Sequence, residues 1–569
     1  MDILYRTKSS TRWLFLAISL LVFQPLTLSA QTGTQTNEFT APSITDDIAH
    51  PETADHFIEQ GRKLESSGSW GDALSLYQKA IKSYPNNEKL VERRTIARIH
   101  YDLQRRYSDN SFRKTLLASN GTESLNVYSE VLLKVQSYYV DQPDWARLAS
   151  FGLHSLEVAL RSPDFRQMNI PKSSETEIQS AVEKIRTSLS GQTVSSRHDA
   201  YVIASTVANR MDQLIGLPVR STIYEFTNGA IAALDPYSSY MSDSQYGEAM
   251  SQIEGNFVGL GVELRTHDDH LEIVSVIPGG PAHNANVAED DRIIAVDGLG
   301  VKETGSEKSA DMLRGLEGSF VSITVQREGM KTQSIRLQRR RVDIPSVEDV
   351  KIVDNVNKVG YIRLTNFQKK TIRDFDNALW KLHGQGMQSL IVDVRGNPGG
   401  LLSASVDVAN RFVSSGVIVS TRGRNPIEDY THRAEIANTW RVPLVVLIDE
   451  NSASASEIFA AAIRDHRRGT IVGHQSFGKG SVQGIFPLNV SGGGVRLTTA
   501  KFYSPHGKPI SEVGVAPDVK VQVTAKASDI STGSSQNGND SALRVGIRVA
   551  SQAVAMRQKN IQQRSIAGR

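Results

Sequence analysis

The sequence predicts a multidomain protein of mixed α+β and α/β class, with an N-terminal helical region, a small β-rich module and an α/β core. Its 569 residues exceed what one hydrophobic core organises, so we expect several domains. Up to about residue 245, apolar residues recur at spacings of three and four, as in LNVYSEVLLKVQSYYV. Beyond that point short Val- and Ile-rich runs take over, and from Val342 they alternate with helical segments.

The bulk composition excludes several classes of function. The chain carries 64 Lys and Arg against 61 Asp and Glu, and this net charge of +3 gives no sign of a nucleic-acid partner. The absence of cysteine excludes disulfides, thiolate metal sites and a cysteine nucleophile. We expect neither a cofactor nor a bound metal.

Residues 1–30 have the layout of a secretory signal peptide. Basic residues precede the apolar run 13–23, and small residues follow up to Ala30, after which cleavage is expected. The alternative is an uncleaved membrane anchor, although the apolar run is about half the ~20 residues that a spanning helix needs. We therefore expect export to the periplasm or cell envelope.

Residues 31–50 are rich in Thr, Asn and Ser and are expected to form a linker before a helical region, residues 51–245. Within that region, residues 54–87 resemble one tetratricopeptide repeat, although an ordinary helical hairpin is an alternative. The matching positions are Gly61, Ala73, Tyr77, Ala80 and Pro85. A single repeat cannot bury its own face, so it must pack on the following helices or on a partner such as an adaptor protein.

Residues 246–341 have the pattern of a small α+β module, with β-type runs such as HLEIVSVI and SFVSITVQ. The segments VGLGV and GGPAHNANVAEDDRIIAVDG resemble a PDZ domain. In that family the first segment receives a peptide's C-terminal carboxylate on backbone N–H groups, and the peptide adds as a strand. The resemblance assigns this peptide-binding role to Val258, Gly259, Leu260, Gly261 and Val262.

Residues 342–524 alternate strands and helices, which indicates βαβ units in an α/β core. The expected strands are VGYIRL, SLIVDVRG and VPLVVLID, and the expected helices are FDNALWKLHGQG, LLSASVDVANRFV and SASEIFAAAIRDH. The motif NPGG forms a turn between the second strand and the second helix. Residues 525–569 are expected to be a disordered linker and a basic tail with a short helix.

The stretch NSASASEIF, residues 451–459, holds three candidate nucleophiles at the start of a predicted helix. Ser452 can cap that helix, and the charge of Glu457 in its first turns suits the helix dipole. Ser456 is two residues from Ser454 and so points in a different direction. As a base, His466 lies about 18 Å along the helix from Ser454, too far for a hydrogen bond. His474 can return on the next strand and stays open as an alternative.

Lys479 is the other candidate base, in GHQSFGKGSVQ. A lysine base must be neutral, which requires burial or a nearby positive charge. The flanking glycines remove bulk and let other groups approach the amine, although a lysine between glycines is also common in exposed turns. Lys479 lies 25 residues after Ser454, and Gln483 lies four residues after Lys479.

This pairing of segments resembles the carboxyl-terminal processing peptidases, or tail-specific proteases. The resemblance covers about residues 219–522 and includes LDPYSSYM, DVRGNPGG and LTTAKFYSPHGKPI. It implies that Ser454 is the nucleophile, Lys479 the general base and Gln483 the residue that orients the lysine. Asp465 matches an acidic position of the family and is expected to support the lysine or loop geometry, or to be a helix-end charge.

The implied mechanism needs donors for a tetrahedral oxyanion. Ser454 is expected at the first turn of its helix, where the N–H of Ala455 can point at the oxyanion. A second donor is expected from the NPGG turn, at Gly399 or Gly400, and one such donor is worth ~3 kcal/mol in the transition state.

The predicted function is that of an exported serine endopeptidase that takes protein substrates by their C-terminal tails. Two alternatives remain. One is a non-catalytic PDZ and tetratricopeptide scaffold in the cell envelope, and the other is a hydrolase that uses His474 as its base.

Overall fold

The structure is a computed structural model that describes residues 15–16, 53–435, 439–521 and 540–567. The predicted linker and nearly all of the predicted signal peptide lie outside these residues; the exception is strand β1 (Phe15–Leu16). The chain divides into a helical unit, with described residues 53–243 and 486–497, and a mixed unit, with described residues 15–16, 244–435, 439–485, 498–521 and 540–567. None of the described helices combines the length and the hydropathy needed to cross a lipid bilayer.

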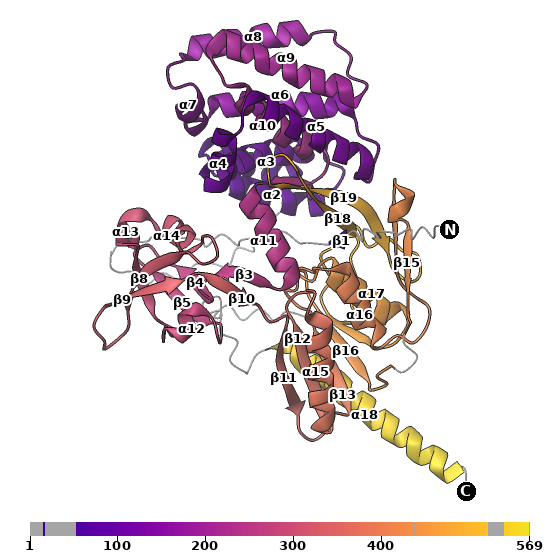
Figure 1. Cartoon of the computed structure of the whole chain (residues 1–569). Coiled ribbons are helices and arrows are strands. Elements are labelled where there is room, and N and C mark those ends of the chain that lie inside the picture. The colour runs from indigo at the N-terminus through magenta and orange to yellow at the C-terminus, as the bar shows by residue number, and fades with distance from the viewer. Residues whose placement is uncertain (1–14, 17–52, 436–438, 522–539, 568–569) are drawn as a thin grey trace, which may run out of the picture. The chain divides into compact units, whose positions relative to one another are not determined.

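The helical unit is the predicted N-terminal helical region (Figure 1). Its elements are α1 (Ala54–Ser66), α2 (Trp70–Ser83), α3 (Glu88–Ser108), α4 (Asn110–Ala118), α5 (Gly121–Tyr138), α6 (Trp145–Arg161), α7 (Pro163–Asn169), α8 (Glu175–Leu189), α9 (Arg197–Ile215), α10 (Val219–Ala232) and β2 (Ser239–Met241). Side-chain caps start several of them; Asn120, Ser174 and Ser196 each form a capping box. The aromatic residues Tyr224 and Phe226 of α10 are buried in the core of this unit.

The hairpin of α1 and α2 packs through the small residues that the repeat pattern indicates. A side chain at Gly61 would overlap the ring of Tyr77, so glycine is what allows the two helices to approach. Leu90 and Ala97 of α3 belong to the same buried cluster as this hairpin. The hairpin therefore leans on the next helix, as a single repeat must.

The β-rich module has one main sheet with the strand order β4-β5-β6-β8-β9, to which β7 pairs at β6. Its strands are β4 (Val262–Thr266), β5 (Leu271–Val276), β6 (Arg292–Val296), β7 (Leu299–Gly300), β8 (Phe320–Gln326) and β9 (Gln333–Gln338). Three short helices complete it: α12 (Pro281–Asn284), α13 (Val301–Thr304) and α14 (Ser306–Leu313). A separate ladder pairs β3 (Asn256–Gly259) with β10 (Arg340–Asp343), after α11 (Asp243–Glu254).

The α/β core is built on the sheet β11-β12-β13-β16-β17-β20. Its strands are β11 (Val347–Asp354), β12 (Val359–Leu364), β13 (Ser389–Asp393), β16 (Leu444–Ile448), β17 (Thr470–Gly473) and β20 (Val519–Lys520). All pairings are parallel except the antiparallel edge strand β11. The predicted βαβ units are thus confirmed, and the carboxyl ends of β13 and β16 meet at one edge of the sheet.

Helices cover both faces of this sheet, because alternate residues of each strand point to opposite sides. Leu390 and Val392 of β13 pack in one cluster with α15 (Thr371–Gly384), α16 (Leu402–Asn410) and α17 (Ala455–Asp465). Ile391 packs in a second cluster with the C-terminal helix α18 (Ser541–Ala567). Both faces are therefore buried, which explains the continuous apolar run LIV at residues 390–392.

The C-terminal tail differs from the expected short helix, while the predicted disordered linker before it lies, up to residue 539, outside the described residues. Residues 541–567 form one helix of 27 residues, α18, whose first half lies on the sheet and whose second half runs beyond it (Figure 1). Gly546 allows this contact, since a Cβ there would lie 2.9 Å from a methyl carbon of Leu447. The apolar residues of α18 are spaced among arginines, which hides its buried face in the sequence.

A second sheet contains the strands β18 (Ser481–Pro487), β19 (Gly494–Tyr503), β14 (Val417–Gly423) and β15 (Tyr430–Arg433), in that order, with the short helix η1 (Pro426–Glu428) before β15. Strand β1 pairs with β18, and β2 pairs with the first residues of β19. The β18–β19 hairpin tip, residues 486–497, belongs to the helical unit.

Candidate active site

Ser454 lies at the junction between β16 and α17, directly before the first residue of the helix. Its backbone has φ 57° and ψ −113°, which is a strained conformation for a residue other than glycine. The side chain is fully buried, and its Oγ has no hydrogen-bond partner within the described residues. A buried hydroxyl without a partner on a strained turn is an arrangement that serves a reactive group better than a structural one.

The carboxylate of Glu457, one turn into α17, joins the two predicted catalytic segments. Its Oε2 accepts hydrogen bonds from the N–H groups of Ser454, at 2.8 Å, and Lys479, at 2.9 Å. Its Oε1 accepts from Ser476 Oγ at 2.6 Å and from the N–H of Gly478 at 2.7 Å. The sequence predicts Glu457 as a charge that suits the helix dipole, whereas its full burial and these hydrogen bonds make it an internal anchor.

Burial raises the pKa of the Glu457 carboxyl, and the four hydrogen bonds offset that rise only in part. The carboxylate thus fixes the backbone on both sides of the site. Sequence reasoning had one clue to it, since Glu457 is the only acidic residue within NSASASEIF.

Lys479 and Gln483 lie on either side of the start of β18 and are both buried, with 3% and 0% of their surface exposed. The amide nitrogen of Gln483 donates to Ser481 Oγ at 2.9 Å. The amide oxygen of Gln483, which was expected to accept from the lysine amine, has no partner among the described residues. Glu457 therefore joins the backbones of Ser454 and Lys479, while Gln483 Oε1 and Ser454 Oγ form no hydrogen bond within the described residues.

The NPGG turn packs directly against Ser454. A Cβ added to Gly399 would lie 2.8 Å from Cβ of Ser454 and 3.0 Å from the nitrogen of Ala455. The N–H of Gly399 donates to its neighbour Asn397 Oδ1 at 2.8 Å. By contrast, the N–H groups of Ala455 and Gly400 have no acceptor in the part of the chain that the structure describes. Of the two glycines that the sequence left open, Gly400 has the available donor.

Ser452 and Ser456 fix this turn. Ser452 Oγ donates to the carbonyl of Val394 at 2.8 Å, so it does not cap α17 as expected; Ser454 itself occupies the cap position. Ser456 Oγ donates to the carbonyl of Asn397 at 2.9 Å. Both side chains therefore link the serine-rich stretch to the strand β13 and the turn after it.

Asp465, His466 and His474 are engaged in other contacts. The carboxylate of Asp465 pairs with Arg464 at 3.1 Å and accepts from the N–H of His506 at 3.3 Å, so it holds the loop after β19. His466 bonds the carbonyl of Val417 at 2.7 Å through Nε2, and His474 bonds that of Val521 at 2.8 Å through Nε2. The other ring nitrogen of His474 lies 3.7 Å from the Glu450 carboxylate.

Asp465 also shows a perturbed pKa. Burial raises it, but hydrogen bonds and the charge of Arg464 more than reverse this, so the pKa of Asp465 is lowered. A carboxylate held ionised in an ion pair supports the reading of Asp465 as a residue that fixes loop geometry.

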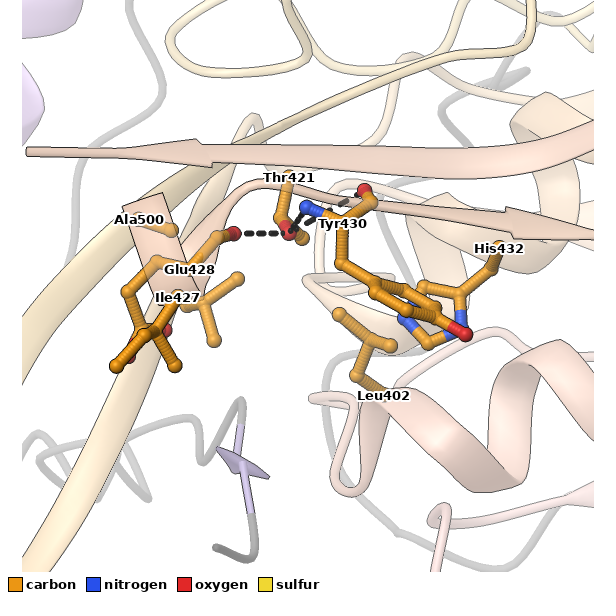
Figure 2. A pocket seen from close by; sticks show the side chains of 8 residues that line it. Leu402, Thr421, Ile427, Glu428, Tyr430, His432 and Ala500 are labelled. Carbon is orange, nitrogen blue, oxygen red and sulfur yellow. Dashed lines mark hydrogen bonds between the residues drawn. The ribbon is translucent and has the colours of Figure 1, made fainter. Parts of the chain in front are cut away.

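A pocket is lined by residues of α16, η1 and the strands β14, β15, β18 and β19 (Figure 2). Leu402, three residues after Gly399, and Val482, three residues after Lys479, both line it. Its full lining is Leu402, Thr421, Ile427, Glu428, Tyr430, His432, Val482 and Ala500. Burial raises the pKa of Glu428 and lowers that of His432, so both tend toward their neutral forms.

The predicted carboxylate-binding loop runs from the end of β3 to the start of β4. Gly261 has φ +79°, and a Cβ there would lie 3.3 Å from the Cα of Gly280. The N–H groups of Leu260 and Gly261 have no acceptor among the residues that the structure describes. Because β4 is an end strand of its sheet, its outer edge can take a further strand.

Comparison with known proteins defines the class first. Residues 258–337 match the PDZ domain, and residues 358–521 match peptidase family S41. Residues 53–243 of the helical unit lie outside both ranges, whereas its hairpin tip, residues 486–497, falls within the second. The fold and these matches together define a serine peptidase with a PDZ domain.

The relatives then define the family. A carboxy-terminal-processing protease of Bartonella bacilliformis is 39% identical over 301 residues, which are 52% of this chain and 68% of the relative. A carboxyl-terminal-processing protease of Picosynechococcus sp. is 34% identical, over 53% of this chain and 73% of the relative. Among solved structures, a photosystem II D1 C-terminal processing protease is 26% identical with a TM-score of 0.38, covering 70% of this chain and 93% of that one. The chain belongs to the carboxyl-terminal-processing proteases.

Proposed function

We propose that Ser454 is the nucleophile and Lys479 its general base. The observation that carries this is the shared carboxylate: Glu457 Oε2 holds the backbone N–H of both residues, so two segments 25 residues apart in sequence meet at one oxygen atom. Two side-chain oxygens without hydrogen-bond partners give further support to this assignment. Ser454 Oγ and Gln483 Oε1 are both buried and without partners among the described residues, and a lysine amine placed between them would satisfy both.

The chemistry follows from these positions. Lys479 takes the proton of Ser454 Oγ as that oxygen attacks the scissile carbonyl carbon. The resulting oxyanion binds the N–H groups of Ala455 and Gly400, which have no other acceptor within the described chain. Lys479 then returns the proton to the leaving amine, and water hydrolyses the acyl-enzyme. Gln483 orients the lysine through its amide oxygen.

The substrate is proposed to be a protein whose C-terminal tail binds at the loop 258–262. The tail carboxylate would accept from the N–H groups of Leu260 and Gly261, with the peptide added along β4. The pocket next to Leu402 and Val482 would take an apolar side chain near the scissile bond, since most of its lining is apolar. Filling it with Ala500→Phe should raise KM for substrates with a bulky residue at that position.

Activity against an unfolded protein with a free C-terminus tests the assignment. Ser454→Ala and Lys479→Ala should each abolish cleavage, whereas His474→Ala, the matched test of the alternative base, should retain it. Full activity in Ser454→Ala, or loss in His474→Ala with the fold intact, would refute the Ser/Lys pair. Amidation of the substrate's C-terminus should weaken its capture.

Export and a partner for the α1–α2 hairpin remain separate proposals. The basic, apolar and small segments of residues 1–30 support export, and N-terminal sequencing of the protein recovered from the cell envelope should start at Gln31. The repeat-like hairpin 54–87 supports an adaptor, and deleting it should release any copurifying protein while leaving peptide cleavage intact.

A further inference from the structure

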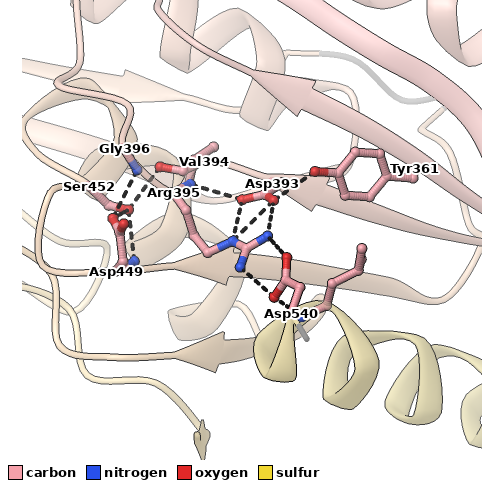
Figure 3. Close-up of polar contacts among 9 residues, drawn as sticks. Tyr361, Asp393, Val394, Arg395, Gly396, Asp449, Ser452 and Asp540 are labelled. Carbon is pink, nitrogen blue, oxygen red and sulfur yellow. Dashed lines mark hydrogen bonds and ion pairs between the residues drawn. The ribbon is translucent and has the colours of Figure 1, made fainter. Parts of the chain in front are cut away.

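An ion-pair network, buried at Asp393 and exposed at Asp540, joins the C-terminal helix to the strand end that precedes the glycine turn (Figure 3). The guanidinium of Arg395 lies between two carboxylates. On one side it donates to Asp393, with the closest contact at 2.6 Å. On the other side it forms a bidentate pair with Asp540, both bonds being 2.8 Å long. Planar, two-bond pairing of this kind fixes orientation as well as distance.

The Asp393 side of the network is rigid. Asp393 is the last residue of β13 and is 1% exposed. It also accepts the hydroxyl of Tyr361 at 2.7 Å and the N–H of Arg395 at 3.0 Å. Burial lowers the pKa of Arg395, but its hydrogen bonds to Asp393 and Asp540 more than reverse this and raise it. The guanidinium therefore stays charged, and its orientation depends on both carboxylates.

The Asp540 side belongs to α18. Asp540 directly precedes the helix and caps it, because its Oδ1 accepts the N–H of Leu543 at 2.9 Å. Burial raises the pKa of Asp540, while the hydrogen bond and charge of Arg395 lower it by more. The helix then lies on the sheet, with Ala542 and Ala550 buried. One carboxylate thus fixes both the start of α18 and one face of the Arg395 side chain.

Arg395 in turn begins the glycine turn. The next residue, Gly396, donates its N–H to Asp449 at 2.9 Å. Asn397 donates to the carbonyl of Leu364 at 2.8 Å, and its own carbonyl accepts the N–H of Ala453 at 3.0 Å. A short chain of bonds therefore runs from α18 through Arg395 to the turn that packs against Ser454.

We propose that α18 contributes to the geometry of the active site. Asp540, which caps this helix, is a positioning residue that acts through Arg395 on the Gly399–Gly400 turn. This inference rests on the proposed role of that turn as the oxyanion site. Without the Asp540 carboxylate, the Arg395 guanidinium is paired with Asp393 alone, and the start of the turn 396–400 is held less rigidly. Displacing a transition-state donor by about 1 Å is enough to lower a rate by about a hundred-fold.

The substitution Asp540→Asn tests the proposal on the full chain. Asparagine caps helices as well as aspartate does, so the bond to Leu543 and the helix are kept while the anionic partner of Arg395 is lost. With a short peptide substrate, kcat should fall by about ten-fold and KM should change by less than about two-fold. Asp540→Glu, which restores the charge on a longer side chain, should recover part of the lost kcat.

The matched control is Ser551→Ala. Ser551 lies on the same helix and bonds Asp354 at 3.0 Å, so it also ties α18 to the core, but on the opposite side from the turn. This variant should have wild-type kcat. An equal loss of kcat in Ser551→Ala, or wild-type kcat in Asp540→Asn, would overturn the proposal.

Two further readouts keep the test decisive. If Asp540→Asn lost its far-UV circular dichroism, Asp540→Ser, which also caps a helix without carrying a charge, would carry the test: reduced kcat in a folded protein supports the proposal, and wild-type kcat refutes it. Residual activity in Ser454→Ala would instead mean that the proposed function has failed, whatever Asp540→Asn does.

Discussion

Two glycine turns in this protease are suited to bind a negatively charged oxygen, and they differ in how they are held. The turn of residues 396–400 is tied down by Asn397, Ser456 and Asp449 and packs against Ser454. The loop 259–261 leads into β4, which is the edge strand of its sheet, so the N–H donors of the loop lie at that edge. Both contain at least one glycine with positive φ, and both have N–H groups without acceptors among the described residues.

In the proposed function, the 259–261 loop binds a ground state, the substrate tail, and the 396–400 turn stabilises a transition state. A donor that must meet charge only as it develops has to be fixed beforehand, because movement during the reaction consumes the benefit. A donor that captures a tail can adjust as the peptide adds to the sheet. We therefore expect damage to the first turn to lower kcat and damage to the second to raise KM.

The largest effect is expected from Gly399→Ala. Its Cβ would lie 2.8 Å from Cβ of Ser454, at a φ of +109°, so the turn or the serine must shift. We expect kcat on a short peptide to fall by about a hundred-fold, the range for loss of one oxyanion donor. Steady-state kinetics measure this. A change confined to KM would contradict the expected difference between the turn 396–400 and the loop 259–261.

Gly261→Ala should change KM and not kcat. The nearest atom to its Cβ is the Gly280 Cα, 3.3 Å away, and φ is +79°, so the loop is displaced without being destroyed. KM for a protein with a free tail should rise by about ten-fold while kcat on a short peptide is unchanged. Equal kinetics on amidated and free-tail substrates in the wild type would contradict the role given to the loop.

The smallest effect is expected from Glu457→Gln. The Glu457 carboxylate holds the backbone of Ser454, against which the turn 396–400 packs. The pKa of Glu457 is raised above 4.5, so its contribution to the free energy of unfolding is fully present below pH 4.5 and declines as pH rises through the raised folded value. In Glu457→Gln this dependence should vanish, with an overall loss of about 1–3 kcal/mol. Urea unfolding of both proteins from pH 4 to pH 8 measures it. A stability difference that is constant with pH would show that Glu457 does not titrate as described.

The spacing of Ser454, Lys479 and Gln483 resembles that of a family, and their catalytic roles stay a prediction from that resemblance. Sequence reasoning could not choose between Gly399 and Gly400, since the choice depends on Asn397 taking one N–H. It gave Ser452 the cap position, which the strained backbone of Ser454 occupies instead.

Other features were hidden for a different physical reason. Glu457 resembles any acidic residue in a first helical turn, and only burial shows that it accepts four hydrogen bonds. The helix α18 has arginines among its apolar residues, so its buried face is recognisable only against the sheet. The tertiary environment, rather than local pattern, decides both.

Covalent labelling of the serine tests the central claim most directly. A fluorophosphonate that reacts with activated serines should modify the wild-type protein at Ser454 alone, as read by mass spectrometry of the peptide that contains it. The same reagent should leave Lys479→Ala essentially unlabelled, because the hydroxyl then lacks its base. Modification at Ser452 or Ser456, or undiminished labelling in Lys479→Ala, would contradict the Ser454–Lys479 pair.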